Sequence, residues 1–126
     1  MATVVASIPG GKGARFIVNR SSALGQRAVI TIRVPGGTVL TTYDAKAING
    51  QPVTFETAPH PETRRVEITG YYHYFERGYK ESPEGKVLSA RDGGNITVIG
   101  FDDNGRDDDG ERDYDFNDCT VTIELI

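Results

Sequence analysis

The residues best suited to chemistry in this sequence are acids gathered near its C-terminal end. Residues 102–118 read DDNGRDDDGERDYDFND, which holds nine carboxylates and two arginines and has a net charge of −7. The remaining residues have a net charge of +3. Carboxylates this close repel one another, so packing them into a folded loop costs free energy unless a cation neutralises them. The pattern predicts a cation site, with a solvated acidic loop as the alternative.

Calcium is the cation that suits this acidic stretch best. Ca²⁺ takes roughly six to eight oxygen ligands from carboxylates, amides and backbone carbonyls. Four side-chain oxygen groups fall within six residues: Asp113, Asp115, Asn117 and Asp118. The stretch contains no histidine or cysteine, which are the ligands that zinc and copper favour, and magnesium rarely binds so many protein carboxylates. We therefore expect one or two calcium ions.

A second spacing within the stretch also fits calcium. Asp107, Asp109 and Asp113 follow a D-x-D-G-x-x-D order around a glycine, which permits a sharp turn. Aromatic residues at 114 and 116 favour a packed loop over a solvated one. The glutamate and the flanking helices of an EF-hand are missing, so that class of calcium site is excluded.

The segments around the acidic stretch show the period-two alternation of β-strands. We predict strands at Thr3–Ile8, Ala14–Asn19, Arg27–Val34, Thr38–Tyr43, Val53–Thr57, Arg64–Tyr74, Lys86–Ala90, Asn95–Phe101 and Cys119–Ile126. Residues 35–37 and 92–94 have the composition of turns, and 44–48 (DAKAI) predicts one helical turn. About nine short strands indicate an all-β fold, an antiparallel β-sandwich or jelly roll, in one domain spanning 1–126.

The last strand has a clear inner face. Its alternation predicts that one set of residues faces the core: Cys119, Val121, Ile123 and Leu125. Cys119 is the only cysteine, so an internal disulfide is impossible. We expect a buried thiol, with a disulfide between two chains as the alternative.

The order Asp113-Tyr114-Asp115-Phe116-Asn117-Asp118, followed by a terminal strand, resembles the bacterial calcium-mediated fucose- and mannose-binding lectins. The N-terminal residues Met1-Ala2-Thr3, Ser7-Ile8-Pro9 and Ala14-Arg15-Phe16 are similar to that family as well. Members of that family are nine-stranded sandwiches in which two adjacent calcium ions bind sugar hydroxyls directly, and the resemblance implies such a sandwich with calcium-mediated sugar binding.

The resemblance also implies roles for single residues. Asp113, Asp115, Asn117 and Asp118 fall on the family's calcium-ligand positions. Asp102 matches a preceding acidic ligand, with Asp109 as the competing choice, and Asn19 matches an asparagine from an early loop. Residues 104–112 look like an insertion. The family's C-terminal glycine, which reaches a partner's calcium, has no counterpart at Ile126, so the partner's ligand, the second calcium and the family's dimer are not implied here.

An aromatic stretch offers a second candidate sugar site. Residues 71–79 read YYHYFERGY, and alternation places Tyr72 and Tyr74 on one face. Aromatic rings pack against the apolar face of a pyranose, and such a site would need no metal. The simpler interpretation is that one face of this strand lies in the core. Arg64-Arg65, at the start of the same strand, is predicted to be a solvated strand end.

Several functions are excluded or disfavoured. The net charge of −4 argues against nucleic-acid binding, and no apolar run is long enough to insert in a membrane. The N-terminus lacks a secretory signal pattern, so we expect a cytoplasmic protein, with action outside the cell after release. No Ser-His-Asp or Cys-His arrangement is present, so we expect no enzyme activity.

The sequence therefore predicts a calcium-dependent lectin for fucose-type or mannose-type glycans. Two sites in one particle raise avidity, so a homodimer is expected. The cytoplasmic defence lectins of fungal fruiting bodies fit this description. The alternatives are a calcium-stabilised structural or adhesive module without sugar affinity, and a metal-independent lectin that uses the 71–79 aromatic face.

Overall fold

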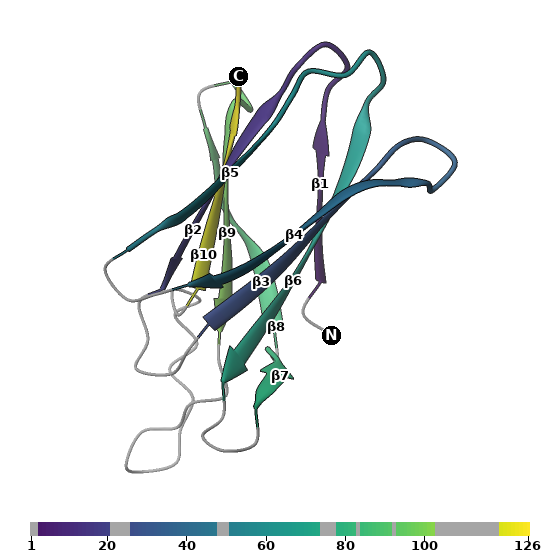
Figure 1. Cartoon of the computed structure of the whole chain (residues 1–126). Helices are drawn as coiled ribbons and strands as arrows, with labels where there is room; N and C mark the ends of the chain where they lie inside the picture. Colours follow the sequence, from purple (N-terminus) through teal and green to yellow (C-terminus); the bar gives the residue numbers. More distant parts are fainter. Residues whose placement is uncertain are drawn as a thin grey trace.

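A computed structural model describes residues 3–20, 26–47, 51–73, 78–82, 84–91, 93–102 and 119–126, and its regular structure is entirely β-strand (Figure 1). The strands are β1 (Thr3–Ile8), β2 (Ala14–Arg20), β3 (Gln26–Arg33), β4 (Val39–Ala47), β5 (Val53–Thr57), β6 (Arg64–His73), β7 (Tyr79–Glu81), β8 (Glu84–Arg91), β9 (Ile96–Asp102) and β10 (Cys119–Leu125). In this part of the chain no helix is long and apolar enough to cross a membrane.

The strands form two antiparallel sheets that face each other (Figure 1). The first sheet has the order β1-β6-β3-β4, and the short β7 pairs with the end of β6 beyond β1. The second sheet has the order β5-β2-β10-β9-β8. The predicted β-sandwich is confirmed, and every one of the nine predicted strands forms. The three-residue β7 was not predicted.

The core lies between the sheets and is built by strict alternation. β3 alternates buried and half-buried residues along its whole length. In β10, Cys119 and Val121 are fully buried and Ile123 is 3% exposed, as predicted for its inner face. Leu125 packs against the same core from the strand end. Period-two alternation therefore places one apolar face of each sheet against the other.

The predicted helical turn at 44–48 is wrong. Residues 44–47 belong to β4, where Asp44 pairs with Val29 and Ala45 with Ala28 of β3. Ala45 is fully buried, so the small side chain fills a core position. Pairing with β3 and burial between the sheets override the local helical preference of Ala and Lys. Residue 48 lies outside the described residues.

One aromatic ring at the centre of the core requires two glycines. Phe101 of β9 is fully buried, and its ring lies against Gly70 of β6 in the opposite sheet and Gly85 of the neighbouring β8. A Cβ atom on Gly70 would lie 2.5 Å from Cδ1 and 2.6 Å from Cγ of the ring. A Cβ atom on Gly85 would also overlap the ring. Glycine is therefore needed at both positions for its lack of a side chain.

We expect Gly70→Ala to destabilise the fold by about 1–3 kcal/mol, the cost of forcing extra volume into a packed core. Thermal unfolding followed by circular dichroism measures this. In a Phe101→Leu background the same substitution should cost less, because the smaller side chain leaves room for the methyl group. An unchanged melting temperature for Gly70→Ala, or an equal cost in both backgrounds, would contradict this packing.

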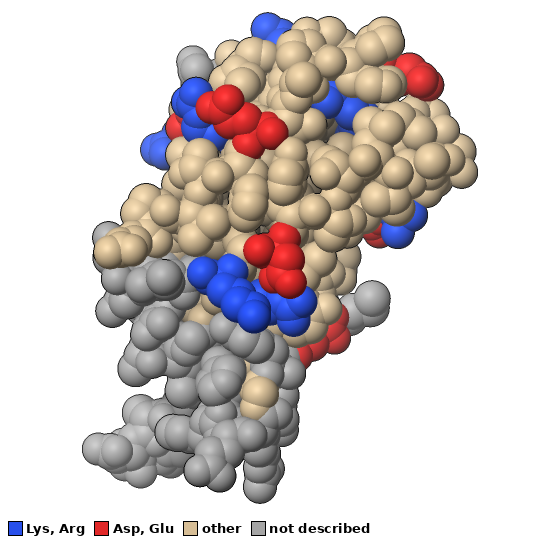
Figure 2. All heavy atoms as spheres, in the orientation of Figure 1, with Lys and Arg blue, Asp and Glu red and all other residues tan. Residues whose placement is uncertain are grey.

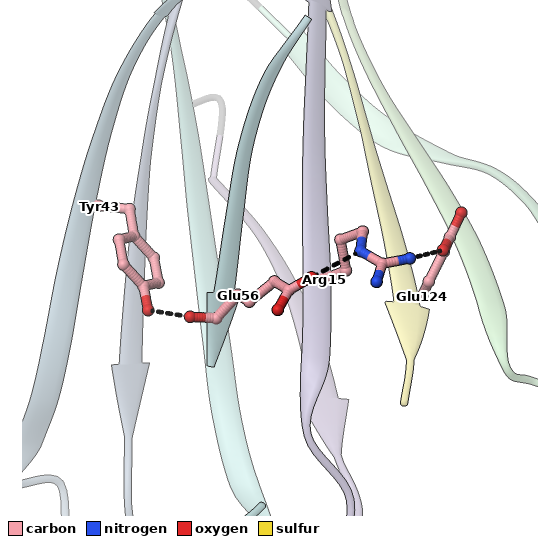
Figure 3. A network of polar contacts seen from close by, with 4 residues as sticks. All are labelled: Arg15, Tyr43, Glu56 and Glu124. Carbon is pink, nitrogen blue, oxygen red and sulfur yellow. Dashed lines mark hydrogen bonds and ion pairs between the residues drawn. The ribbon is translucent and has the colours of Figure 1, made fainter. Parts of the chain in front are cut away.

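A polar network joins the two sheets along their β4 and β5 edges (Figure 3). Arg15 of β2 donates from Nε to Oε1 of Glu56 at 2.9 Å and from Nη1 to Oε2 of Glu124 at 3.2 Å. The hydrogen bond to Glu56 raises the pKa of Arg15 above its ordinary value. The Tyr43 hydroxyl of β4 donates to the backbone oxygen of Glu56 at 2.8 Å, and its ring stacks on Phe55. These contacts close one side of the sandwich.

Candidate functional site

The acidic stretch is held between two neighbouring strands. β9 ends at Asp102 and β10 begins at Cys119, and these strands pair so that Phe101 lies opposite Cys119. Residues 103–118 therefore connect one end of β9 to the adjacent end of β10. The predicted ligands within this segment, Asp109, Asp113, Asp115, Asn117 and Asp118, lie outside the described residues. The structure therefore describes only the two residues that flank this segment, Asp102 and Cys119.

The sheet order brings Asn19, a predicted ligand from an early strand, to the same end of the sheet as Asp102. Asn19 is exposed near the end of β2, and its backbone pairs with Thr120 of β10. The neighbouring Arg20 pairs with Cys119, the first residue after the acidic stretch. β10 thus has Asn19 of β2 on one side and the end of β9 at Asp102 on the other. Two predicted ligands more than eighty residues apart in sequence therefore lie at one end of one sheet.

The donors available at this end are oxygens. Cys119 is fully buried, so its thiol lies in the core. Asn19 supplies an amide oxygen, and the adjoining stretch supplies carboxylates. Among the described residues no group of three or more His, Cys, Asp or Glu side chains is placed to hold a metal. The predicted oxygen donors would suit calcium better than zinc or copper, and the calcium site stays a prediction.

The aromatic stretch 71–79 does not form an open sugar platform where it is described. Tyr72 is only 5% exposed and lies on the inner face of β6, so the prediction that it binds sugar finds no support. Buried rings cannot pack against a pyranose. Tyr74 lies outside the described residues. The face of β6 that carries Tyr72 is the core face, which is the simpler of the two interpretations drawn from the sequence.

The outer face of β6 at Tyr71 is already covered in part by an ion pair between Arg27 and Asp44. The guanidinium of Arg27 lies 5.2 Å from the centre of the Tyr71 ring. Its Nε and Nη2 donate to the two carboxylate oxygens of Asp44 at 2.7 and 2.6 Å. This bidentate pairing holds the pKa of Asp44 below its usual range. The cation over the ring leaves less of the Tyr71 face available to a sugar.

The structure shows one group of polar residues that the sequence did not predict as a site. Arg33, Arg65 and Glu67 line a pocket. The turn that joins β3 to β4 lies beside it, at the opposite end of the strands from the end of β9 and the start of β10 (Figure 1). The prediction of a solvated Arg64-Arg65 pair is wrong for Arg64, which is 1% exposed. Alternation along β6 carried a signal, because Arg64 falls on the same face as the buried Val66 and Ile68.

Comparisons with known proteins support the fold. No protein-family model and no curated protein sequence matches the chain. Among solved structures, it is similar to Chromobacterium violaceum lectin CV2L in complex with alpha-methyl-fucoside, at TM-score 0.56 and 17% identity over 94% of this chain and 92% of that one. It is also similar to a high-affinity mannose-binding lectin of Ralstonia solanacearum, at TM-score 0.57 and 14% identity over the same shares. The chain therefore has the fold of these two bacterial lectins.

Proposed function

We propose that this chain is a lectin that binds fucose-type or mannose-type glycans through calcium at the 102–118 end of the sandwich, without catalysis. One observation carries the proposal. In the order β2-β10-β9, Asn19 of β2 and Asp102 of β9 lie on the two strands on either side of β10, near its first residue, where the acidic stretch ends. The shared fold with two lectins, one solved with alpha-methyl-fucoside and one described as mannose-binding, supports the sugar class.

The residues proposed to hold calcium are oxygen donors from three parts of the chain: Asp113, Asp115, Asn117 and Asp118, together with Asp102 or Asp109, and Asn19. When bound, calcium would accept vicinal sugar hydroxyls in place of water. The carboxylates around it would accept hydrogen bonds from the same hydroxyls. Only hydroxyls of suitable stereochemistry satisfy both interactions, which favours the arrangement shared by fucose and mannose.

A glycan array run on calcium-loaded and metal-stripped protein tests this function. We expect binding to fucosylated or mannosylated glycans in calcium and its loss after stripping. Binding that survives stripping would replace the proposal with a metal-independent lectin. Absence of binding in both states, together with calcium-dependent stability, would replace it with a structural or adhesive module.

We also propose that the protein is a homodimer held by noncovalent contacts. A single shallow sugar site binds weakly, and a second site in the same particle raises avidity by about 10²–10⁴. Cys119 is fully buried, so it is not placed to link two folded chains. Light scattering should give about twice 13.7 kDa with and without reductant. A mass near 13.7 kDa in both conditions would refute the dimer, and a reductant-sensitive dimer would refute the burial argument.

A further inference from the structure

A polar pocket lies at the end of the sandwich opposite the end of β9 and the start of β10. It has a volume of about 590 Å³ and lies between the turn that joins β3 to β4 and the start of β6. Its lining includes Ser7, Arg33, Pro35, Thr63, Arg65 and Glu67. Figure 2 shows Lys and Arg atoms in the recess beside this projecting turn. Pockets of roughly 300–1,000 Å³ accommodate small molecules.

The walls of the pocket are set by strand register and by a turn that contains two glycines. Ser7 of β1, Arg65 of β6 and Arg33 of β3 lie side by side across the first sheet. The turn opposite them contains Gly36 and Gly37, both with left-handed backbone angles (φ of 95° and 93°). A Cβ atom on either glycine would meet nothing within 4 Å, and both glycines line the pocket.

The pocket carries more positive than negative charge. Arg33 donates from Nε to Glu67, and from Nη1 to the backbone oxygen of Gly37 at 2.9 Å. Arg65 reaches the same glutamate only at 3.8 Å, and its side chain is 60% exposed. One carboxylate is thus shared by two guanidinium groups. The guanidinium of Arg65 retains donors that no described carboxylate takes up at hydrogen-bond distance.

A third arginine, Arg64, also lines the pocket, from the inner face of β6. Arg64 is 1% exposed and donates from Nη1 to the backbone oxygen of Ala58 at 3.0 Å and from Nη2 to that of Lys12. Its Nε has no hydrogen-bond partner, and it forms no ion pair with any described carboxylate. Burial lowers the pKa of its guanidinium below the ordinary value. A buried cation without a counter-ion is costly, and an anion nearby would relieve that cost.

We propose that this pocket binds the carboxylate or sulfate group of an acidic saccharide. Arg65 contacts the anion, and the charges of Arg33 and Arg64 hold it there. The apolar ring of Pro35 packs against the sugar's C–H face, and the hydroxyls of Ser7 and Thr63 bond to its hydroxyl groups. Arginine suits carboxylate and sulfate alike, because its planar fork offers paired donors to two oxygens.

This second site does not depend on the calcium site. The pocket lies at the end of the sandwich opposite Asp102 and Cys119, where the 102–118 stretch begins and ends, and that stretch has a net charge of −7. An acidic sugar is repelled by that stretch and attracted by the arginine pocket. The molecule would then bind neutral sugars at one end and acidic sugars at the other, and either site can fail without the other.

The test uses metal-stripped protein in metal-free buffer, with the chelator dialysed away because its own carboxylates would compete. Amide shifts of Gly36 and Gly37 in NMR spectra report on the pocket. The probes are methyl β-D-glucuronide, glucose 6-sulfate, the neutral methyl β-D-glucoside and inorganic sulfate. We expect both acidic sugars to shift these amides and the neutral sugar not to. A response to only one of them identifies carboxylate or sulfate as the preferred group.

Three single-residue variants sharpen the test. Arg65→Gln should weaken binding of the acidic sugar roughly tenfold, the loss of about one charge-assisted hydrogen bond. Glu67→Gln should strengthen it, because it removes the competing carboxylate. Arg91→Gln changes the net charge as Arg65→Gln does, but on the exposed end of β8 in the other sheet, and should leave binding unchanged.

Four results would overturn the inference. The first is an absence of shifts at Gly36 and Gly37 with either acidic sugar. The second is equal weakening by Arg65→Gln and Arg91→Gln, which would show an unspecific charge effect. The third is binding of inorganic sulfate as tight as that of glucose 6-sulfate, which would show that the pocket binds an anion without recognising the sugar. The fourth is acidic-sugar binding that requires calcium, which would assign it to the other end of the molecule.

Discussion

Protein stripped of metal is expected to melt roughly 10 °C lower than the same protein in excess calcium. The proposed site binds calcium only when the fold brings β2, β9 and β10 together, so the ion stabilises the native state alone. At a hundredfold excess over the dissociation constant, this linkage contributes about 2.7 kcal/mol. For a domain of this size, each kcal/mol shifts the melting temperature by about four degrees. Differential scanning calorimetry measures the shift.

Magnesium is the matched control for calcium. It carries the same charge but demands a compact octahedral arrangement and keeps several waters. We expect magnesium to restore little of the lost stability and calcium to restore all of it. Equal recovery with both ions would indicate simple screening of the −7 stretch. Identical melting curves in calcium, in magnesium and without metal would contradict the calcium site.

Substitution of single carboxylates in the acidic stretch is expected to abolish sugar binding. Asp113→Asn, Asp115→Asn and Asp118→Asn each remove one charge while keeping the shape of the side chain. Loss of a residue that only hydrogen-bonds to a metal ligand already weakens metal binding by about 10–100-fold. Loss of a direct charged ligand should weaken calcium-dependent sugar binding by at least about a hundredfold. Isothermal titration with methyl fucoside at fixed calcium measures the change.

Glu62→Gln is the control for these variants. Glu62 is exposed in the connection between β5 and β6, and the change removes one negative charge far from the acidic stretch. We expect it to bind sugar as the parent does. If Asp115→Asn and Asp118→Asn also retain full affinity, the sugar binds elsewhere and the acidic stretch is not the site.

The strands and their buried faces were largely predictable from the sequence. β1 and β5 begin and end at the predicted residues, and other strand bounds differ by a few residues. Period-two alternation encodes a buried face directly, because each strand in a sandwich has one face toward the opposite sheet. The inward direction of Cys119 followed from the same rule and is confirmed.

Alternation alone did not decide the structure where the local sequence was compatible with two interpretations. Alternation from Val66 and Ile68 indicates the inner face for Tyr72, but both faces of residues 71–74 carry aromatic residues, and the burial of Tyr72 decided against a sugar platform there. In residues 44–47 the local preference for helix lost to pairing with β3. Arg64 is buried because backbone oxygens of Ala58 and Lys12, from two separate turns, accept its hydrogen bonds. Alternation along β6 indicates the inner face for Arg64, but no local pattern shows which backbone oxygens accept its hydrogen bonds.

By itself the sequence determined the chemistry of the candidate site: a dense set of oxygen donors, no nitrogen or sulfur ligand among them, and a strand on either side. Only the tertiary structure decided which residues from other parts of the chain lie at the same end of the sheet as the two ends of that stretch. Strand order places β10 between β2 and β9, which brings Asn19 beside Thr120. In the other sheet it pairs β3 with β6, which brings Arg65 beside Arg33. Strand order is set by burial and pairing summed over the whole chain, so residues distant in sequence meet only once the sandwich has formed.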